Sequence, residues 1–444
     1  MTFLLLLAVL IAVLVGTLIV FKYRQIFPYA MVTFVGVFYL SSEGISIKLG
    51  SINVYGSDLF IAFAIVNIFF RLLHDAEPLS KNARMLIFGF LAYVVWLQLS
   101  EIVHFYSYEP SRRLDNLIRI TTVNLYPLVA VSIVLSLSIH QFRLFFGYIA
   151  FIAACVSVGL IFKEVFDIGG HVTSSGSIRR GAGEVTVLLH IGLGYALFRK
   201  NLGFVIRVVC VLLILSGIAL LSHRSSFLGT GLLLAIYFIY TLRYQLNKEK
   251  AILAVPAVAF ASVAIVLFVS FSNLSAVESF RNRLSETTNL ENKTSVGRLQ
   301  KWTVAMKSVV ENPIGGTKLN GLDDFYGDYL LEADFGRFTT ADAHGAFLFL
   351  LEPDPWPPHN MFVNILSRNG VVALAFFLLA IFGAILVLKK RDARSKYCGT
   401  AILFANIVYL TFNNHYKFAV ATTLAICLFA IPLRISLDED KKDE

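Results

Sequence analysis

Uncharged apolar runs recur from one end of this chain to the other. A helix needs roughly 20 apolar residues to cross a bilayer, and each run is compatible with one crossing helix, although several are short or carry a polar residue. Counting them gives about 13 spans, and 12 is also compatible because boundaries read from a single sequence err by a few positions. We expect an all-α polytopic integral membrane protein with about 12–13 transmembrane helices. The runs lie near 2–21, 27–41, 57–73, 85–105, 117–137, 144–163, 185–198, 203–222, 225–242, 251–272, 361–388, 398–412 and 417–433.

Composition agrees with a bilayer as the main solvent. Of the 444 residues, 57% are hydrophobic and only 15% are charged, which is too apolar for a soluble protein. The formal net charge of +9 could suggest nucleic acid. Many basic residues, however, sit in short links between apolar runs, as expected for cytoplasmic loops, so we predict no nucleic-acid partner. The first run, 2–21, lacks the basic start and the cleavage site of a secretory signal and is expected to be a retained span.

The four cysteines favour neither a disulfide framework nor a zinc site. Cys155, Cys210 and Cys427 lie within apolar runs, and Cys398 starts one. None falls in the long polar segment, where an oxidising compartment could pair it, and no zinc-ligand spacing occurs.

Two basic links set the expected orientation. Arg243, Lys248 and Lys250 form one, and Lys389 to Lys396 carries five basic residues in the other. Both should be cytoplasmic, which places the links near 164–184 and 223–224 and the polar segment 273–358 outside. That segment contains a helix-like stretch around Val296–Glu311 and should form an external subdomain. The expected division is transmembrane helices in 1–272 (about ten spans), an external loop subdomain in 273–358, transmembrane helices in 359–433 and a cytoplasmic tail in 434–444.

Arginines on the outer side are informative because the positive-inside rule gives no reason for them. Arg224 lies between two apolar runs, so its planar, permanently charged guanidinium should sit at headgroup level, where it suits phosphate. An interfacial anchor that reaches to water explains that position equally well. Arg179 and Arg180 precede Gly181 and Gly183, whose backbone amides could approach an anion closely.

Arg298 and His359 are the other candidates. Arg298 shares an amphipathic helix with Lys301, Trp302 and Lys307, so a solvated basic face is the alternative to ligand binding. His359 follows Pro357-Pro358 and begins an apolar helical run. A helix N-terminus disfavours imidazolium, so His359 should stay neutral and able to accept a proton, unless it is only a capping or interfacial residue.

No metal is expected. His223, His344 and His359 are far apart, and no His-x-x-x-His or Cys-His spacing occurs. The acidic pairs Asp323-Asp324 and Glu352/Asp354 are read as solubilising residues of the loop, although they could bind a cation.

Taken in order, these motifs resemble the O-antigen ligase and O-antigen polymerase family. The resemblance covers roughly residues 175–390 and ends with His359-Asn360 shortly before Gly370. Its earlier motifs are Arg180-Gly-Ala-Gly183, Ser222-His-Arg-Ser-Ser226, Gly297-Arg298 followed by Trp302, and Glu311-Asn-Pro-Ile-Gly-Gly316.

The resemblance implies a specific activity. Members of this family move a glycan from an undecaprenyl-pyrophosphate carrier to an acceptor sugar, without a metal or other cofactor, at the periplasmic face of the bacterial inner membrane. On that pattern His359 is the general base in an inverting transfer, and Arg224 and Arg298 hold the pyrophosphate. Arg180 assists, with Arg179 as the alternative because the arginine is doubled here. The segment Thr339–Trp356 departs from the pattern and would shape the acceptor pocket.

Several alternatives stay open at this point. The acceptor could be lipid A-core, another carrier-linked repeat unit, or a protein. A transporter or flippase of a lipid-linked or anionic solute would also use arginines, but it should place ionisable residues near the membrane centre, where Arg119 and His190 are among the few candidates. A scaffolding membrane protein would leave the ordered arginines and His359 unexplained.

Overall fold

The computed structural model describes most of the expected helices. The described residues are 25–41, 46–49, 52–74, 80–107, 124–166, 171–172, 178–179, 185–199, 202–221, 224–245, 293–317, 360–412 and 418–437. Two expected spans, 2–21 and 251–272, lie outside them, as does the first part of the run near 117–137.

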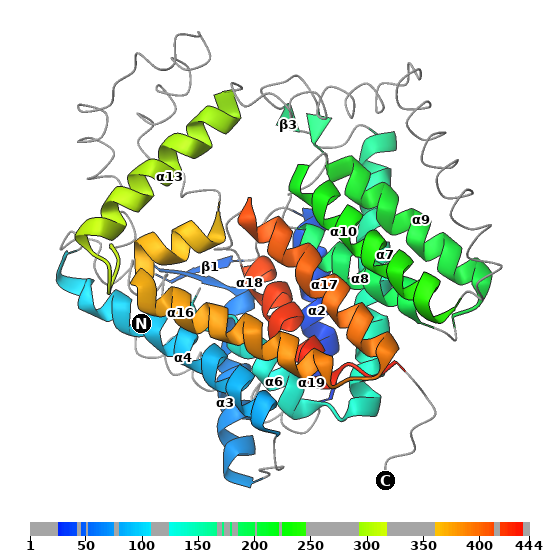
Figure 1. Cartoon of the computed structure of the whole chain (residues 1–444), viewed down its shortest axis with the longest axis horizontal. Helices are drawn as coiled ribbons and strands as arrows, with labels where there is room; N and C mark the ends of the chain where they lie inside the picture. The colour runs from blue at the N-terminus through cyan, green and yellow to red at the C-terminus, as the bar shows by residue number, and fades with distance from the viewer. Residues whose placement is uncertain are drawn as a thin grey trace.

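The protein is an all-α, multi-pass membrane protein (Figure 1). Five described helices are long and apolar enough to cross a membrane: α4 (Lys81–Val103), α7 (Ile139–Val165), α9 (Phe204–Leu221), α10 (Arg224–Tyr244) and α16 (Met361–Lys389). The others in the bundle are α2 (Phe27–Ser41), α3 (Gly56–His74), α6 (Leu128–Ser136), α8 (Thr186–Phe198), α17 (Ala393–Thr411), α18 (Phe418–Ala425) and α19 (Ile431–Arg434), with a π-helical turn at Ile426–Ala430 joining the last two.

Two small ribbons were not expected from the sequence. Strands β1 (Ser46–Leu49) and β2 (Ile52–Tyr55) pair antiparallel, with Ser46 opposite Tyr55. Strands β3 (His171–Val172) and β4 (Ile178–Arg179) form the second pair. Both ribbons lie in links between helices and are too short to produce a periodic sequence pattern, so they leave the fold class unchanged.

Side-chain caps explain where several helices begin. Ser138 and Gln141 form a capping box at the start of α7, each side chain bonding the other residue's backbone N–H. The Asp392 carboxylate accepts a bond of 2.8 Å from the backbone N–H of Ser395, so α17 begins at Ala393 rather than near 398 as expected. At α16 the Asn360 side-chain oxygen accepts from Phe362 N (3.0 Å) and Val363 N (3.2 Å).

The antiparallel pair α4 and α16 packs closely because glycines face the partner backbone. A Cβ on Gly89 would come within 2.9 Å of the Ala380 nitrogen, and one on Gly383 within 2.8 Å of the Leu86 Cα. Small residues at such positions let membrane helices approach each other. The rings of Phe90 and Phe429 stack at 4.8 Å behind this contact, where the π-helical turn joins the core.

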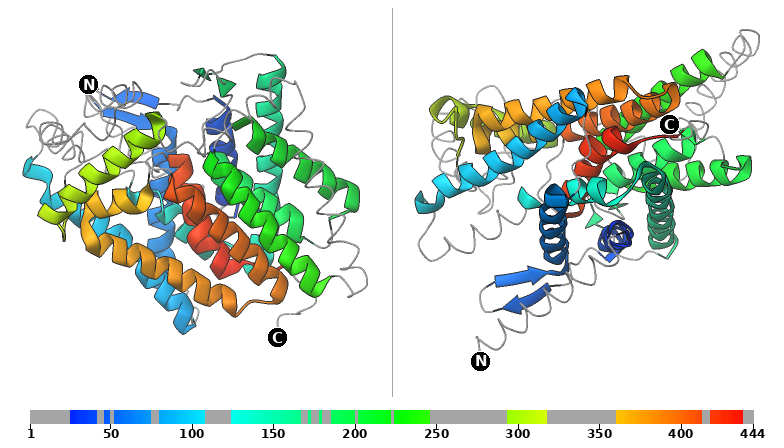
Figure 2. Two further views of the ribbon diagram at one scale, coloured as in Figure 1. Left: turned by 45° about the horizontal axis from the view of Figure 1, so that its top comes forward. Right: turned by 90° about the horizontal axis from the view of Figure 1, so that it is seen from below.

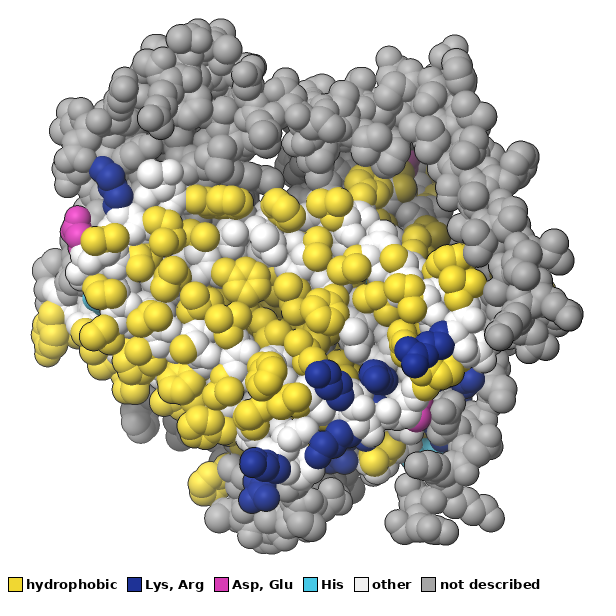
Figure 3. All heavy atoms as spheres, in the orientation of Figure 1, with side chains coloured by type: hydrophobic (Ala, Val, Ile, Leu, Met, Phe, Trp, Pro, Cys, Tyr) yellow, Lys and Arg dark blue, Asp and Glu magenta, His cyan; other side chains and the backbone are white. Residues whose placement is uncertain are grey.

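Basic residues gather at one end of the bundle. The Asn82 side chain near the start of α4 donates to the Leu386 carbonyl near the end of α16 (3.3 Å). Arg394 in the first turn of α17 donates to the hydroxyl of Tyr240 in the last turns of α10 (3.2 Å). These contacts bring together the basic residues that flank the helices, and Figure 3 shows Lys and Arg gathered along one edge below a broad apolar band. We call this edge the basic end.

The first turns of α8, α10 and α16 consequently lie at the opposite end. Their last turns lie at the basic end, because Phe198 of α8 packs on Tyr240 and α16 ends at Lys389, just before α17. Helix α13 (Lys293–Glu311) lies beside the first part of α16, away from the basic end (Figures 1 and 2). The helix predicted around Val296–Glu311 is thereby confirmed.

Candidate functional site

The candidate residues fall on four segments. The backbone of Arg224 begins α10, that of Arg298 lies in α13, and that of Arg179 lies in β4. Arg180 and His359 are outside the described residues. Asn360, the next residue after His359 in the sequence, is the N-cap of α16.

The helix starts that follow the first two arginine motifs are bonded to each other. The hydroxyls of Thr186 in α8 and Ser226 in α10 lie 2.5 Å apart, and both residues are buried. Thr186 comes shortly after Gly183, and Ser226 lies less than one helical turn after Arg224. The two motifs therefore lead into neighbouring helices at the same end of the bundle.

Helix α13 is fastened to α16 by backbone hydrogen bonds. The Val371 N–H donates to the Pro313 carbonyl (2.8 Å), and the Thr317 N–H donates to the Ser367 carbonyl (2.9 Å). These bonds form where α16 breaks its helical backbone, at Gly370 with φ 80° and ψ 179°. We call this contact the α13–α16 clamp. It joins the helix that carries Arg298 to the helix that follows His359.

The clamp requires glycine at two positions. Gly316 has φ 69° and Gly370 has φ 80°, both in the left-handed region that disfavours side chains. A Cβ on Gly370 would collide with the Ile314 carbonyl, and one on Gly316 with the Arg368 carbonyl. The two glycines of the family-like motifs thus have one physical explanation, the close approach of two backbones.

Helix α4 supports the break in α16. The Asn369 side chain donates to the Ser100 hydroxyl (2.8 Å), and the Trp96 ring N–H donates to the Asn369 carbonyl (2.8 Å). These bonds satisfy polar groups that the interrupted helix would otherwise leave open.

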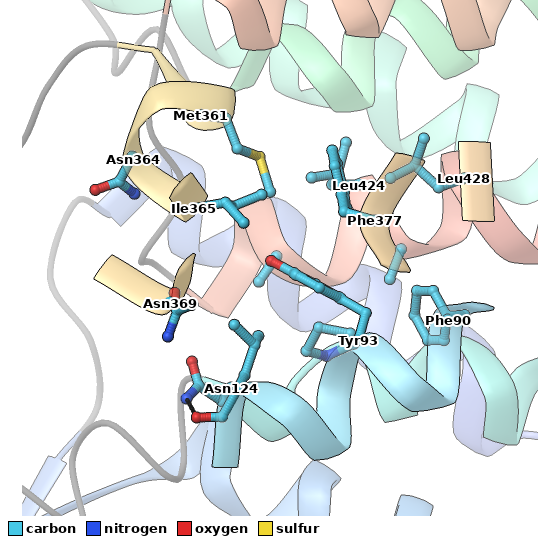
Figure 4. A pocket seen from close by; sticks show the side chains of 14 residues that line it. Phe90, Tyr93, Asn124, Met361, Asn364, Ile365, Asn369, Phe377, Leu424 and Leu428 are labelled. Carbon is cyan, nitrogen blue, oxygen red and sulfur yellow. Dashed lines mark hydrogen bonds between the residues drawn. The ribbon is translucent and has the colours of Figure 1, made fainter. Parts of the chain in front are cut away.

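A pocket lies beneath the first turn of α16. It encloses about 60 Å³. Figure 4 shows three carboxamides on one side, from Asn124, Asn364 and Asn369, and mainly apolar side chains on the other. The apolar wall comes from α4, the second part of α16 and the α18 segment, and includes Phe90, Tyr93, Phe377, Leu424 and Leu428.

The polar side of the pocket has unused hydrogen-bonding capacity. The Asn364 side chain is 3% exposed, and its oxygen has no partner within the part of the chain that is described. Carboxamides both donate and accept, and no side chain lining this pocket is charged. The pocket therefore suits a neutral, hydroxyl-bearing group with an apolar side.

Helix α13 bears on one alternative that the sequence left open, the solvated basic face. Its basic residues were candidates for a solvated face, but Lys301 is 1% exposed, whereas Lys307 is exposed. The face that carries Lys301 is buried, so a solvated basic face does not describe the whole helix.

The sequence reasoning did not identify the polar residues of the pocket. Asn364 and Asn369 sit inside an otherwise apolar run, and this interruption was the available signal. Among the residues described, no group of three His, Cys, Asp or Glu side chains is close enough to hold a metal. The acidic pairs considered above, Asp323-Asp324 and Glu352/Asp354, lie outside them.

Comparison with known proteins identifies a family for part of the chain. No curated protein matches the chain. A family model described as O-antigen ligase matches residues 209–378, a range that contains Arg224, Arg298 and His359 and leaves out Arg179 and Arg180. It spans most of α9, all of α10, the α13–α16 clamp and the first part of α16. This match confirms the resemblance read from the motifs: the chain is a multi-pass membrane protein with a region, residues 209–378, that is similar to the O-antigen ligase family.

Proposed function

We propose that this protein transfers a glycan from an undecaprenyl-pyrophosphate carrier to a sugar hydroxyl of an acceptor. The observation that supports the proposal is that the helix starts lie at the same end of the bundle. The Thr186–Ser226 bond joins the starts of α8 and α10, and the α13–α16 clamp joins the helix of Arg298 to the helix that follows His359. All of them lie away from the basic end.

The proposed site faces the periplasm. Basic residues at the ends of membrane helices mark the cytoplasmic side, so the opposite end belongs to the outer face of a bacterial inner membrane. A polyprenyl donor would reach it from the bilayer, with its pyrophosphate at headgroup level. The division into transmembrane helices 1–272, an external subdomain 273–358, transmembrane helices 359–433 and a tail 434–444 is part of this proposal.

In the reaction His359 acts as the general base. Its neutral imidazole takes the proton of the acceptor hydroxyl, and the oxygen forms a bond to the anomeric carbon from the face opposite the carrier. The bond between that carbon and the pyrophosphate oxygen breaks, and its electron pair leaves with the pyrophosphate. The configuration is inverted. The position of His359 directly before the N-cap Asn360 supports this role, because a helix N-terminus favours the neutral ring.

The arginines stabilise the leaving group. Arg224 and Arg298 would hold the pyrophosphate and offset the charge that grows on it, without a metal. Arg180 assists, and Arg179 is the alternative. The matched range supports Arg224 and Arg298 more directly than the doubled pair, since it begins at residue 209.

The pocket under α16 would receive part of a sugar. Its lining includes Met361, two residues after His359 in the sequence, and its carboxamides are neutral partners for hydroxyl groups. We assign it to the acceptor glycan, because the donor's charged end requires cationic partners that the pocket lining does not contain.

Two acceptors fit the proposal, lipid A-core in a ligase and a second carrier-linked repeat unit in a polymerase. A transporter or flippase is the alternative class, and it would use ionisable groups that line a path. His190 is fully buried and bonded to neighbouring helices instead, outside the pocket lining. Arg119 lies beyond the described residues.

The test is transfer of a labelled oligosaccharide from its undecaprenyl-pyrophosphate carrier by the purified protein in lipid nanodiscs. His359→Ala should abolish transfer while donor binding remains. The matched control is His140→Ala, an exposed histidine at the start of α7, which should retain activity. Full activity of His359→Ala would remove the proposed base.

A deletion strain separates the acceptors. Uncapped lipid A-core together with long carrier-linked polymer would identify a ligase, and single repeat units a polymerase. Normal surface glycans would contradict both.

A further inference from the structure

A buried set of hydrogen bonds joins α8, α10 and α17. His190, in the middle of α8, is fully buried. Its Nδ1 lies 3.1 Å from the Asn406 side-chain oxygen on α17, and its Nε2 lies 3.1 Å from the Thr230 hydroxyl on α10. The Ser226 carbonyl is 3.4 Å from the same Nε2. One imidazole therefore connects three helices.

The direction of these bonds follows from Asn406. Its side-chain nitrogen donates to the Ile402 carbonyl (2.8 Å), so its oxygen faces the ring and accepts. His190 must then carry its proton on Nδ1, and Nε2 accepts from the Thr230 hydroxyl. Both ring nitrogens are used within the protein. This arrangement fits a residue that holds helices in place rather than one that exchanges protons with a substrate.

The ring also fixes how closely α10 approaches. A Cβ on Gly229 would come within 2.6 Å of His190 Cε1 and within 2.6 Å of the Ala405 carbonyl oxygen. Glycine at this position lets α10 lie directly against the ring and against α17. A side chain at 229 would push the helix away from both.

The bonds reach the first turn of α10. Thr230, about one turn after Ser226, donates to His190, and the Ser226 hydroxyl pairs with Thr186 of α8. The Ser226 carbonyl lies near the unprotonated Nε2 but makes no hydrogen bond with it in this tautomer. Arg224 precedes Ser226 by two residues, which is less than one helical turn. Helix α8 thus holds the start of α10, which includes the backbone of Arg224, at two points, Ser226 and Thr230.

We propose that His190 is a positioning residue, which fixes the first turn of α10 so that Arg224 meets the pyrophosphate of the donor. This inference rests on the proposed function of Arg224. Buried polar groups in a membrane protein are costly unless they are satisfied, and a binding group is precise only when its support is rigid. The geometry around His190 meets both conditions.

A general role in stability is the competing explanation, and the chain offers a matched control. Asn67 on α3 is also buried, and its carboxamide donates to the Ser132 hydroxyl (2.8 Å) and the Ser136 hydroxyl (2.7 Å) on α6. That cluster also joins helices through buried polar groups, but α3 and α6 carry none of the arginines proposed to bind the donor.

The experiment is a double-mutant cycle on the full-length protein in nanodiscs. His190→Leu, His190→Gln and Asn67→Leu are each made alone and with Arg224→Gln. The measured quantities are the KM for an undecaprenyl-pyrophosphate-linked oligosaccharide, the KM for the acceptor and the unfolding temperature. Arg224→Gln alone tests the proposed function, because an unchanged donor KM would remove Arg224 from donor binding.

We expect His190→Leu to raise the donor KM about tenfold and to leave the acceptor KM unchanged, a change equivalent to about 1.4 kcal/mol. His190→Gln should recover part of this loss, because an amide can keep one of the two bonds. In the Arg224→Gln background, His190→Leu should add little. Asn67→Leu should lower the unfolding temperature and leave both KM values unchanged.

Additive effects of His190→Leu and Arg224→Gln would overturn the inference while leaving the role of Arg224 intact. So would a donor KM that stays constant in a folded His190→Leu protein, or one that Asn67→Leu raises equally.

Discussion

The two junctions that assemble the candidate site are built in different ways. At the α8–α10 junction, side chains make the contact. The hydroxyls of Thr186 and Ser226 pair, and His190 lies about one turn further along α8. At the α13–α16 clamp, backbone atoms make it, and glycines at 316 and 370 clear the space. A side-chain junction can be adjusted by conservative substitution. A backbone clamp should tolerate changes of side chain but not the addition of a Cβ at its glycines.

The largest effect is expected from Gly370→Ala. Alanine at φ 80° and ψ 179° costs about 1–3 kcal/mol, and its Cβ would also collide with the Ile314 carbonyl, so α13 should separate from α16. Transfer should be lost and the unfolding temperature lowered. Gly231→Ala is the control, because a Cβ there meets nothing within 4 Å and alanine is the better helix former. Equal activity of the two variants would contradict the clamp.

The second-largest effect on activity is expected from Asn364→Leu in the pocket. This substitution should weaken acceptor binding without lowering the stability of the fold. Removing a buried carboxamide whose oxygen has no described partner should leave stability unchanged or raise it slightly. The acceptor KM should rise about tenfold, the equivalent of about 1.4 kcal/mol, with the donor KM unchanged. Steady-state kinetics with each substrate varied in turn would check this. A raised donor KM would instead assign the pocket to the carrier.

Thr186→Val should have a moderate effect. It removes one hydroxyl pair, a loss of about 1 kcal/mol, and should raise the donor KM several-fold. Thr186→Ser keeps the hydroxyl and should behave like the unchanged protein. Equal donor KM values for Thr186→Ser and Thr186→Val would contradict a role for the hydroxyl pair.

Thr317→Val should have the smallest effect. The substitution removes the bond from the Thr317 hydroxyl to the Ser367 carbonyl (3.1 Å), but the backbone N–H still donates to the same carbonyl. A loss of about 0.5–1.5 kcal/mol or less in thermal unfolding is expected, with transfer nearly intact. A loss as large as that of Gly370→Ala would show that the clamp depends on side chains after all.

Local sequence signals located the helices well. The amphipathic stretch around Val296–Glu311 is α13, and the apolar run after Pro357-Pro358 begins α16, with Asn360 as its cap. Such features depend on residues a few positions apart. The ribbons β1–β2 and β3–β4 were not predicted from the sequence, because each strand has four residues or fewer.

Contacts between distant residues could not be read from one sequence. Gly316 and Gly370 were noticed as parts of separate motifs, yet their joint role depends on two backbones meeting across the loop between α13 and α16. His190 was noted as a polar residue in an apolar run, but its partner Asn406 lies 216 positions away. The burial of Lys301 could not be predicted either, because the sequence pattern of α13 does not show which residues pack against the helix.

The most direct test of the site is thiol labelling of intact cells whose outer membrane has been removed, in a background without the native cysteines. Arg224→Cys, Arg298→Cys and His359→Cys are treated with a membrane-impermeant maleimide, with and without added undecaprenyl pyrophosphate, and Lys390→Cys reports the basic end. We predict that the first three are labelled from outside and protected by the lipid, while Lys390→Cys reacts only after lysis. Labelling of any of the three only after lysis, or labelling that the lipid does not reduce, would contradict a shared periplasmic site.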